Sequence, residues 1–128
     1  MWFQETVSSY VSILNNCAYS LENHWKNAAH LIDDVKKSEA IEAALWSKTP
    51  QDVFGGMELE MLCYAEKLTL RPSDMVQEDV FALKEAGAGD GEILELNQIV
   101  GYFNYVNRLL NGLGVTTSGD TVGFYKAD

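Results

Sequence analysis

Basic residues and cysteines are both scarce in this chain. Nine Lys and Arg stand against nineteen Asp and Glu, which gives a formal net charge of −10. Because such a charge repels a polyanion, we expect no nucleic acid and no anionic membrane among the partners. The two cysteines, Cys17 and Cys63, lie far apart in sequence and do not resemble a secreted disulfide framework, so reduced thiols are expected.

Long hydrophobic runs are also absent. No apolar stretch approaches the roughly 20 residues that a membrane-spanning helix needs. The start of the chain, MWFQETVSSY, lacks the basic and apolar regions of a signal peptide. These absences predict a cytoplasmic protein. With 128 residues, 47% of them hydrophobic and 22% charged, the chain has the size and composition of a single globular domain.

Apolar residues recur at spacings of three and four along most of the chain, which predicts amphipathic helices. No segment shows convincing strand alternation, so the expected fold is all-α, with about five or six helices in one domain over residues 1–128. The helices are expected over 2–14, from Cys17 to about Val35, from the cap Ser38 to near Pro50, over 57–70, from Ser73 or Asp74 to Gly87, and over 91–110.

The end of the chain follows a different pattern. Residues 115–128 lack a helical period and are expected to form a C-terminal tail ordered only by packing of Val122, Phe124 and Tyr125. The helix before the tail, over 91–110, has a wider apolar surface than a chain of this size readily covers. It therefore predicts a homo-oligomer. Its polar members Asn104, Asn107 and Arg108 are expected to bond across helices or across subunits.

The segment that indicates chemistry is CAYSLENH, residues 17–24. In a helix that begins at Cys17, Ser20 and His24 project from the same face as the cysteine. A cysteine in the first turn lies at the positive end of the helix dipole, which favours the thiolate, the nucleophilic form. A histidine can relay a proton, and an acidic residue from the preceding helix can orient its imidazole. The pattern predicts one cluster, with Cys17 the more reactive thiol.

Simpler interpretations account for the other candidates. A structural zinc ion needs about four ligands, and only Cys17 and His24 fit locally, so no metal is expected. Cys63 lies within an apolar helix stripe and is expected to be a core thiol. The acidic residues near it, Glu58, Glu60 and Glu66, are interpreted as a solvated helix face, with Glu66 the candidate if one of them points inward. The glycine-rich residues 87–91 follow no strand, so they are interpreted as a helix end and no nucleotide cofactor is expected.

The same residues resemble the alkylhydroperoxidase (AhpD)-like family of the carboxymuconolactone decarboxylase superfamily. Its motif is Cys-x-x-Cys-x-x-x-His at the start of a helix, with a glutamate twelve positions before the first cysteine. Cys17, Ser20 and His24 stand at the motif positions, and Glu5 stands twelve positions before Cys17. The segments YAEKLTL (64–70) and GYFNYVNRLLNGLGV (101–115) are similar to the peroxidase-related subgroup, so the resemblance covers nearly the whole chain.

This resemblance implies an oligomeric all-α protein, without a cofactor, that reduces hydroperoxides through a thiolate and is restored by a thiol reductant. The implied catalytic residues are Cys17, Ser20, His24 and Glu5. A serine cannot be oxidised to a sulfenic acid or close a disulfide. In the family the second cysteine is usually taken as the attacking thiol, and here that position is Ser20. Cys17 would then act alone and need an external thiol, unless Cys63 approaches it.

Two other functions are consistent with the serine, whether Ser20 is natural or was introduced. The chain could be a redox-inactive member that binds a small ligand or serves as an oligomeric interaction protein. It could also be a decarboxylase or lactone-opening enzyme of the wider superfamily, because those relatives do not need the cysteine pair. For Cys17 and His24 a purely structural role, as a buried thiol and a hydrogen-bonded helix histidine, is the alternative to a site.

Overall fold

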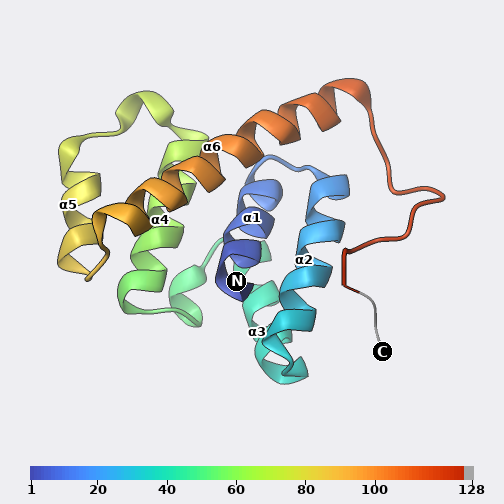
Figure 1. Ribbon diagram of the computed structural model, residues 1–128, viewed down its shortest axis with the longest axis horizontal. Helices are drawn as coiled ribbons and strands as arrows, with labels where there is room; N and C mark the ends of the chain where they lie inside the picture. The colour runs from blue at the N-terminus through green and yellow to red at the C-terminus, as the bar shows by residue number, and fades with distance from the viewer. Residues whose placement is uncertain (126–128) are drawn as a thin grey trace.

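The computed structural model describes residues 1–125, and in this part of the chain the structure is entirely helical, without a strand (Figure 1). The predicted all-α class is therefore confirmed. Six α-helices are joined by short connections, two of which contain a 3-10 turn. The elements are α1 (Trp2–Leu14), α2 (Ala18–Ile32), α3 (Val35–Trp46), η1 (Pro50–Asp52), α4 (Gly56–Leu70), η2 (Pro72–Asp74), α5 (Gln77–Glu85) and α6 (Asp90–Leu113).

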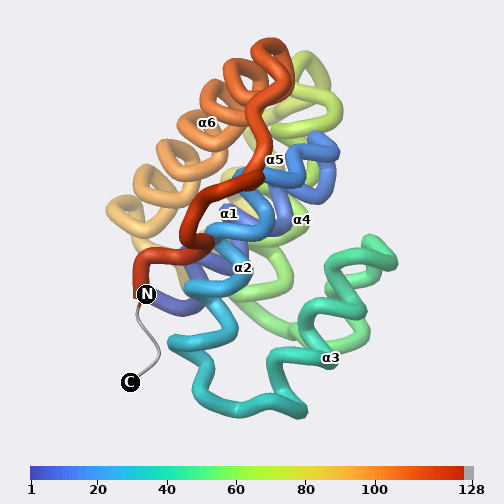
Figure 2. Tube along the Cα trace, turned by 90° about the vertical axis from the view of Figure 1, so that its right-hand side faces the viewer, coloured from blue at the N-terminus to red at the C-terminus, as the bar shows by residue number. Residues whose placement is uncertain are grey.

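Helix α1 lies at the centre and contacts α2, α3, α4 and α6 (Figures 1 and 2). All its residues from Thr6 to Ile13 are buried, although four of them are Ser or Thr. Each of these hydroxyls donates to the carbonyl four residues earlier, for example Ser9 to Glu5 at 2.7 Å and Ser8 to Gln4 at 2.8 Å. Such back-bonding satisfies a hydroxyl inside its own helix. A helix rich in serine can therefore be enclosed by others.

The apolar core forms where α1, α3, α4, α5 and α6 meet. Its most enclosed large side chains come from all five of these helices and are less than 2% exposed: Val7, Tyr10, Val11, Leu45, Leu62, Leu83 and Val100. Truncating one buried Leu of this kind typically costs about 2–5 kcal/mol. Because α1 is held on several sides by this core, the polar residues on its α2 side are fixed in position.

Several helix ends differ from the sequence prediction. Helix α2 ends at Ile32, earlier than expected, because Asp33 adopts the left-handed conformation (φ 52°). Helix α3 then begins at Val35, and its cap is Asp34, which accepts from the Lys37 N–H at 3.0 Å, whereas Ser38 lies within the helix. Both are good cap residues, and the reversal at Asp33 places the helix start at the first of them.

The last two helices also have shifted ends. Helix α5 begins at Gln77, because Ser73 and Asp74, the expected start, belong to the 3-10 turn η2. Helix α6 continues to Leu113 and ends where Gly114 takes the left-handed conformation (φ 67°) that a glycine adopts at low cost. None of the helices described is long and apolar enough to cross a membrane.

The tail runs back along α2 (Figure 2). It is held mainly by side-chain amides of α2: Asn23 accepts from the Gly123 N–H at 3.0 Å and Asn27 from the Phe124 N–H at 2.8 Å. The expectation that Phe124 orders the tail by packing was wrong, because its side chain is 75% exposed. Tyr125 does stack on a helix residue, His30. Residues 126–128 of the predicted tail lie outside the described part.

Candidate functional site

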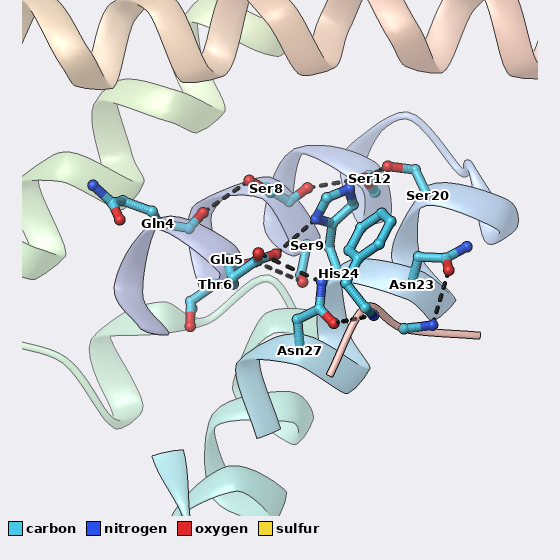
Figure 3. Close-up of polar contacts among 12 residues, drawn as sticks. Gln4, Glu5, Thr6, Ser8, Ser9, Ser12, Ser20, Asn23, His24 and Asn27 are labelled. Carbon is cyan, nitrogen blue, oxygen red and sulfur yellow. Dashed lines mark hydrogen bonds and ion pairs between the residues drawn. The ribbon is translucent and has the colours of Figure 1, made fainter. Parts of the chain in front are cut away.

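The site is built around a carboxylate–imidazole pair between two neighbouring helices. Glu5 of α1 and His24 of α2 meet with 2.6 Å between Oε2 and Nδ1, and each side chain is 19% exposed (Figure 3). The predicted contact between these residues is confirmed. In the neutral imidazole, Nδ1 donates to the carboxylate and Nε2 is left as a proton acceptor. In this arrangement a carboxylate orients an imidazole that can act as a general base.

Asn27 supports the pair and connects it to the tail. Its side chain is 1% exposed, and its Nδ2 donates to Oε1 of Glu5 at 3.5 Å. Its Oδ1 accepts from the Phe124 N–H at 2.8 Å. One buried amide therefore contacts both the Glu5 carboxylate and the backbone of the tail (Figure 3).

Ser20 lies one helical turn before His24 and is 3% exposed. Its Oγ is 2.9 Å from the Oγ of Ser12, which is also 2.9 Å from the carbonyl of Ser8. Asn107 of α6 donates to Ser12 at 3.4 Å. Because the Ser12 hydroxyl has one proton for two acceptors, the direction of the bond between the two serines can reverse. Ser20 thus belongs to a buried chain of hydroxyls.

A cavity of about 370 Å3 lies over Ser20 and His24. The imidazole forms part of its wall and is packed edge-on against Phe103 of α6, with 4.6 Å between ring centroids. The tail closes another side, and Phe124 lies 6.1 Å from the same ring. The lining combines residues of α2, α6 and the tail: Tyr19, Ser20, Asn23, His24, Val106, Leu110, Asp120, Thr121, Gly123 and Phe124.

Cys17 does not share this cavity, so the predicted single cluster is wrong for this residue. Cys17 is the cap that precedes α2, with extended backbone angles (φ −105°, ψ 91°), so its side chain does not follow the helix face. It is 2% exposed and lines a smaller cavity of about 200 Å3. The residues around that cavity are Ser12, Ile13, Asn16, Ala18, Leu21, Glu22 and Trp46.

Cys63 is exposed, and its expected place in the core was wrong. Its neighbours Leu62 and Tyr64 are buried, but Cys63 faces a polar cavity of about 380 Å3. Partial burial, followed by the charges of Glu60 and Glu66, raises the pKa of the Cys63 thiol above its usual range. Raising the pKa lowers the fraction of the reactive thiolate at neutral pH.

Glu66 points inward, which was the alternative to the expected solvated helix face. Its carboxylate accepts a hydrogen bond from the buried Tyr10 hydroxyl of α1. Burial, and then Glu66, hold the pKa of Tyr10 well above its usual range. The predicted bonds of Asn104 and Asn107 to other elements are found, since Asn104 donates to Thr69 at 3.0 Å and Asn15 donates to Asn107 at 3.3 Å. The prediction of a bond across helices was wrong for Arg108, which donates to Asn104 within α6.

Sequence reasoning missed the supporting residues Ser12 and Asn27, and it did not place Asn107 at the site. One signal was available: Glu5, Ser9 and Ser12 recur at helical spacing and form a polar stripe along one side of α1. The same spacing puts Asn27 one turn after His24. No comparable signal marks the tail. Among residues 1–125 no group of three or more His, Cys, Asp or Glu side chains is arranged to hold a metal ion.

Comparisons with known proteins define the fold. A solved structure with TM-score 0.80 is that of an uncharacterized peroxidase-related protein from Silicibacter sp. TM1040. The two chains are 23% identical, and the alignment covers 90% of this chain and 58% of the other, so this chain spans little more than half of that protein. This chain therefore shares the fold of that protein. No family model matches the sequence, and a search of curated proteins found no match.

Proposed function

We propose that this chain is a thiol-dependent peroxidase of the AhpD-like kind in which Cys17 is the oxidised thiol. The observation that carries the proposal is the Glu5–His24 pair, at 2.6 Å, near the start of the helix that Cys17 caps. The peroxidase-related fold supports the same assignment. Ser20 takes the place of the second motif cysteine, so the enzyme works with one thiol and an external reductant.

The position of Cys17 suits a reactive thiol. The first N–H groups of a helix have no acceptor within the helix, and they stabilise a negative charge at the cap. The Cys17 side chain makes no capping hydrogen bond to the start of α2, so its sulfur does not have to break such a bond to react. The adjoining cavity of about 200 Å3 limits the substrate to a small hydroperoxide.

The reaction balances with two molecules of an external thiol. The Cys17 thiolate attacks the terminal oxygen of the hydroperoxide, the O–O bond breaks, and the departing alkoxide takes a proton to become the alcohol. Cys17 is then a sulfenic acid. One external thiol displaces water and forms a mixed disulfide, and a second thiol releases Cys17 and leaves as the external disulfide. In this scheme the Glu5–His24 pair exchanges protons with the reacting groups through water, because Cys17 lines a separate cavity.

The experiment that tests the proposal follows peroxide-dependent oxidation of dithiothreitol. We expect turnover by the unsubstituted chain, its loss in Cys17→Ala, and its retention in the matched control Cys63→Ala. Dimedone added with peroxide should trap a sulfenic acid on Cys17. Ser20→Cys should form a disulfide with Cys17 and raise turnover, since the two positions are one turn apart. Trapping on Cys63 alone, or equal turnover in Cys17→Ala, contradicts the proposal.

A second candidate is a redox-inactive protein that binds a small ligand over Ser20 and His24. It is favoured by the near-complete burial of Cys17, which is 2% exposed. This function predicts no peroxide turnover in the unsubstituted chain, together with ligand-induced shifts of the His24 and Phe124 resonances in NMR spectra. Restored turnover in Ser20→Cys would identify it as a peroxidase scaffold that has lost its redox pair.

We also propose that the chain forms a homo-oligomer through α6. Leu94, Tyr102, Tyr105, Leu109 and Leu113 of this helix are each at least 47% exposed. Tyr102, Tyr105, Leu109 and Leu113 follow helical spacing along one stripe, which is unusual for a surface in contact with water. Light scattering should give a multiple of the 14.3 kDa chain mass. A monomer at micromolar concentration would contradict this, and Tyr105→Lys with Leu109→Lys should dissociate the assembly.

A further inference from the structure

We propose that Ser20 is a nucleophile in its own right and that the cavity over Ser20 and His24 hydrolyses small uncharged carboxylic esters. Three residues carry this activity: Glu5 orients His24, His24 takes the proton, and Ser20 attacks. A nucleophile, a base and an acid that orients the base are the parts of serine acyl transfer, whatever fold presents them. The activity is separate from peroxide reduction, because it needs no thiol.

The proton arrangement of the imidazole is the first support. With Nδ1 at 2.6 Å from the Glu5 carboxylate, the neutral ring carries its proton on that nitrogen. Nε2 is then free to accept a proton. The carboxylate also stabilises the imidazolium that forms when a proton is taken up. The packing of Phe103 against the ring edge limits its rotation, so the base keeps one orientation.

The environment of the Ser20 hydroxyl is the second support. Ser20 and His24 are four residues apart on α2, so they lie on the same helix face. The Ser12 hydroxyl lies 2.9 Å from both the Ser8 carbonyl and Ser20 Oγ, so the proton of Ser20 is left for another acceptor when Ser12 donates to Ser20 and not to Ser8. Asn107 donates to Ser12, which uses a lone pair of Ser12 and leaves its proton for donation. A change of the Ser20 rotamer on substrate binding would close the bond to Nε2.

The lining of the cavity indicates the substrate. Val106, Leu110 and Phe124 provide an apolar wall for a short acyl or alkyl group, and Tyr19 and Thr121 carry hydroxyl donors for a carbonyl oxygen. No Lys or Arg is among the residues that line it, and Asp120 is. An anionic substrate would therefore be disfavoured. The volume of about 370 Å3 fits a small neutral ester.

The reaction proceeds in two balanced steps. Ser20 Oγ bonds to the ester carbonyl carbon while its proton moves to His24 Nε2, and the C–O bond to the leaving alcohol breaks as that proton passes to the leaving oxygen. Water then attacks the acyl-serine, gives a proton to His24, and releases the carboxylic acid as Ser20 regains its proton. No oxidant or reductant is consumed.

The test uses p-nitrophenyl acetate with the full chain. We expect hydrolysis above the buffer rate and an acetyl group on Ser20 in the mass spectrum of protein quenched during turnover. Ser20→Ala should lower kcat/KM about 100-fold, and His24→Gln should do the same. The matched control is Ser47→Ala, which removes an exposed hydroxyl at the end of α3, outside the site, and should leave the rate unchanged. Circular dichroism shows whether each variant is folded.

Two results would overturn the proposal: an unchanged rate in folded Ser20→Ala, or an acetyl group found on Cys17, Cys63 or a lysine and never on Ser20. A pH profile adds a readout that a structural role would not move, because Glu5→Gln should shift the titration of the ester rate as well as lower it. Peroxide reduction is read separately as thiol oxidation. If the chain reduces peroxide but does not hydrolyse the ester, only this inference fails. If it hydrolyses the ester but does not reduce peroxide, only the proposed peroxidase function fails.

Discussion

The two cysteines occupy opposite environments on either side of α1. Cys17 is 2% exposed, precedes a helix and borders the polar network of Ser12 and Ser20. Cys63 is exposed and lies within a helix, and its pKa is raised first by partial burial and then by the carboxylates of Glu60 and Glu66. The accessible thiol is thus the one disfavoured as a thiolate, and the thiol at a favourable helix end is shielded.

The solvent exposure of a thiol can therefore be measured separately from its chemical reactivity. A large alkylating reagent reports on exposure and should modify Cys63, whereas a small hydroperoxide reports on which thiol is the better nucleophile. Each side of α1 also holds one carboxylate in a hydrogen bond between helices, Glu5 with His24 and Glu66 with Tyr10. Matched substitutions on the two sides can therefore test which side carries chemistry.

The largest effect is expected from removing the charge of Glu5. In Glu5→Gln the acid that orients His24 is lost, and peroxide-dependent thiol oxidation should fall about 100-fold, the scale of general acid–base catalysis. Glu66→Gln is the matched control, since it removes the other bonded carboxylate and should change turnover by less than about 2-fold. A comparable loss in both variants would show a general structural effect and remove the distinction between the two sides.

The buried amide on the Cys17 side should matter more for stability than an exposed one on the Cys63 side. Asn107, fully buried, bonds to Ser12 and Asn15, and Asn107→Ala should lower the free energy of unfolding by about 1–3 kcal/mol. Asn97→Ala removes an exposed amide that donates to Tyr64 and should cost less than about 0.5 kcal/mol. Urea unfolding measures both, and equal costs would contradict this assignment of the network.

Differential alkylation should reverse the order that the sequence predicted. Because Cys17 is buried and Cys63 exposed, a bulky maleimide should modify Cys63 at least about 10-fold faster in the native protein. Peptide mass spectrometry after short exposures measures the two rates. Dimedone trapping with a small hydroperoxide should still favour Cys17. If the maleimide modifies Cys17 first, the start of α2 opens in solution.

What the sequence predicted well follows from local periodicity. Helix α1 was expected over residues 2–14 and is found there, and the short turn to α2 brings Glu5 beside His24. The placement of Cys17 could not be derived in this way, because a cap residue leaves the helical backbone and its side chain follows no face. Cys63 was misplaced because the apolar stripe of α4 is wide, and one residue turns a helix by about 100°.

Contacts between segments that are distant in sequence could not be predicted from helical periodicity, for a different reason. The tail has no helical pattern, and its bonds to Asn23 and Asn27 join residues about a hundred positions apart. Such bonds depend on the final packing of α2 against the end of α6. The bond between Tyr10 and Glu66 likewise required the relative rotation of α1 and α4, which neither helix specifies alone.

The smallest effect is expected at Cys63. Its pKa is raised by partial burial and by the charges of Glu60 and Glu66, so Glu66→Gln should lower that pKa. Below the pKa a larger share of the thiol is then ionised, and iodoacetamide should react roughly 2- to 5-fold faster at a fixed pH. The midpoint of the pH–rate profile should move to lower pH. Glu39→Gln, at an exposed site on α3, is the control, and a move to higher pH would contradict the electrostatic cause.

Asn27 has a consequence for regulation. Because the same amide binds the Glu5 carboxylate and the Phe124 N–H, docking of the tail and the state of the Glu5–His24 pair are thermodynamically linked. Linkage is reciprocal: the free energy by which tail docking stabilises the Glu5–His24 contact equals the free energy by which that contact stabilises tail docking. A molecule that binds His24 should therefore shift the equilibrium between the docked and the undocked tail, which a protease that cuts the undocked tail would report, and docking of the tail should change the affinity for that molecule by the same factor.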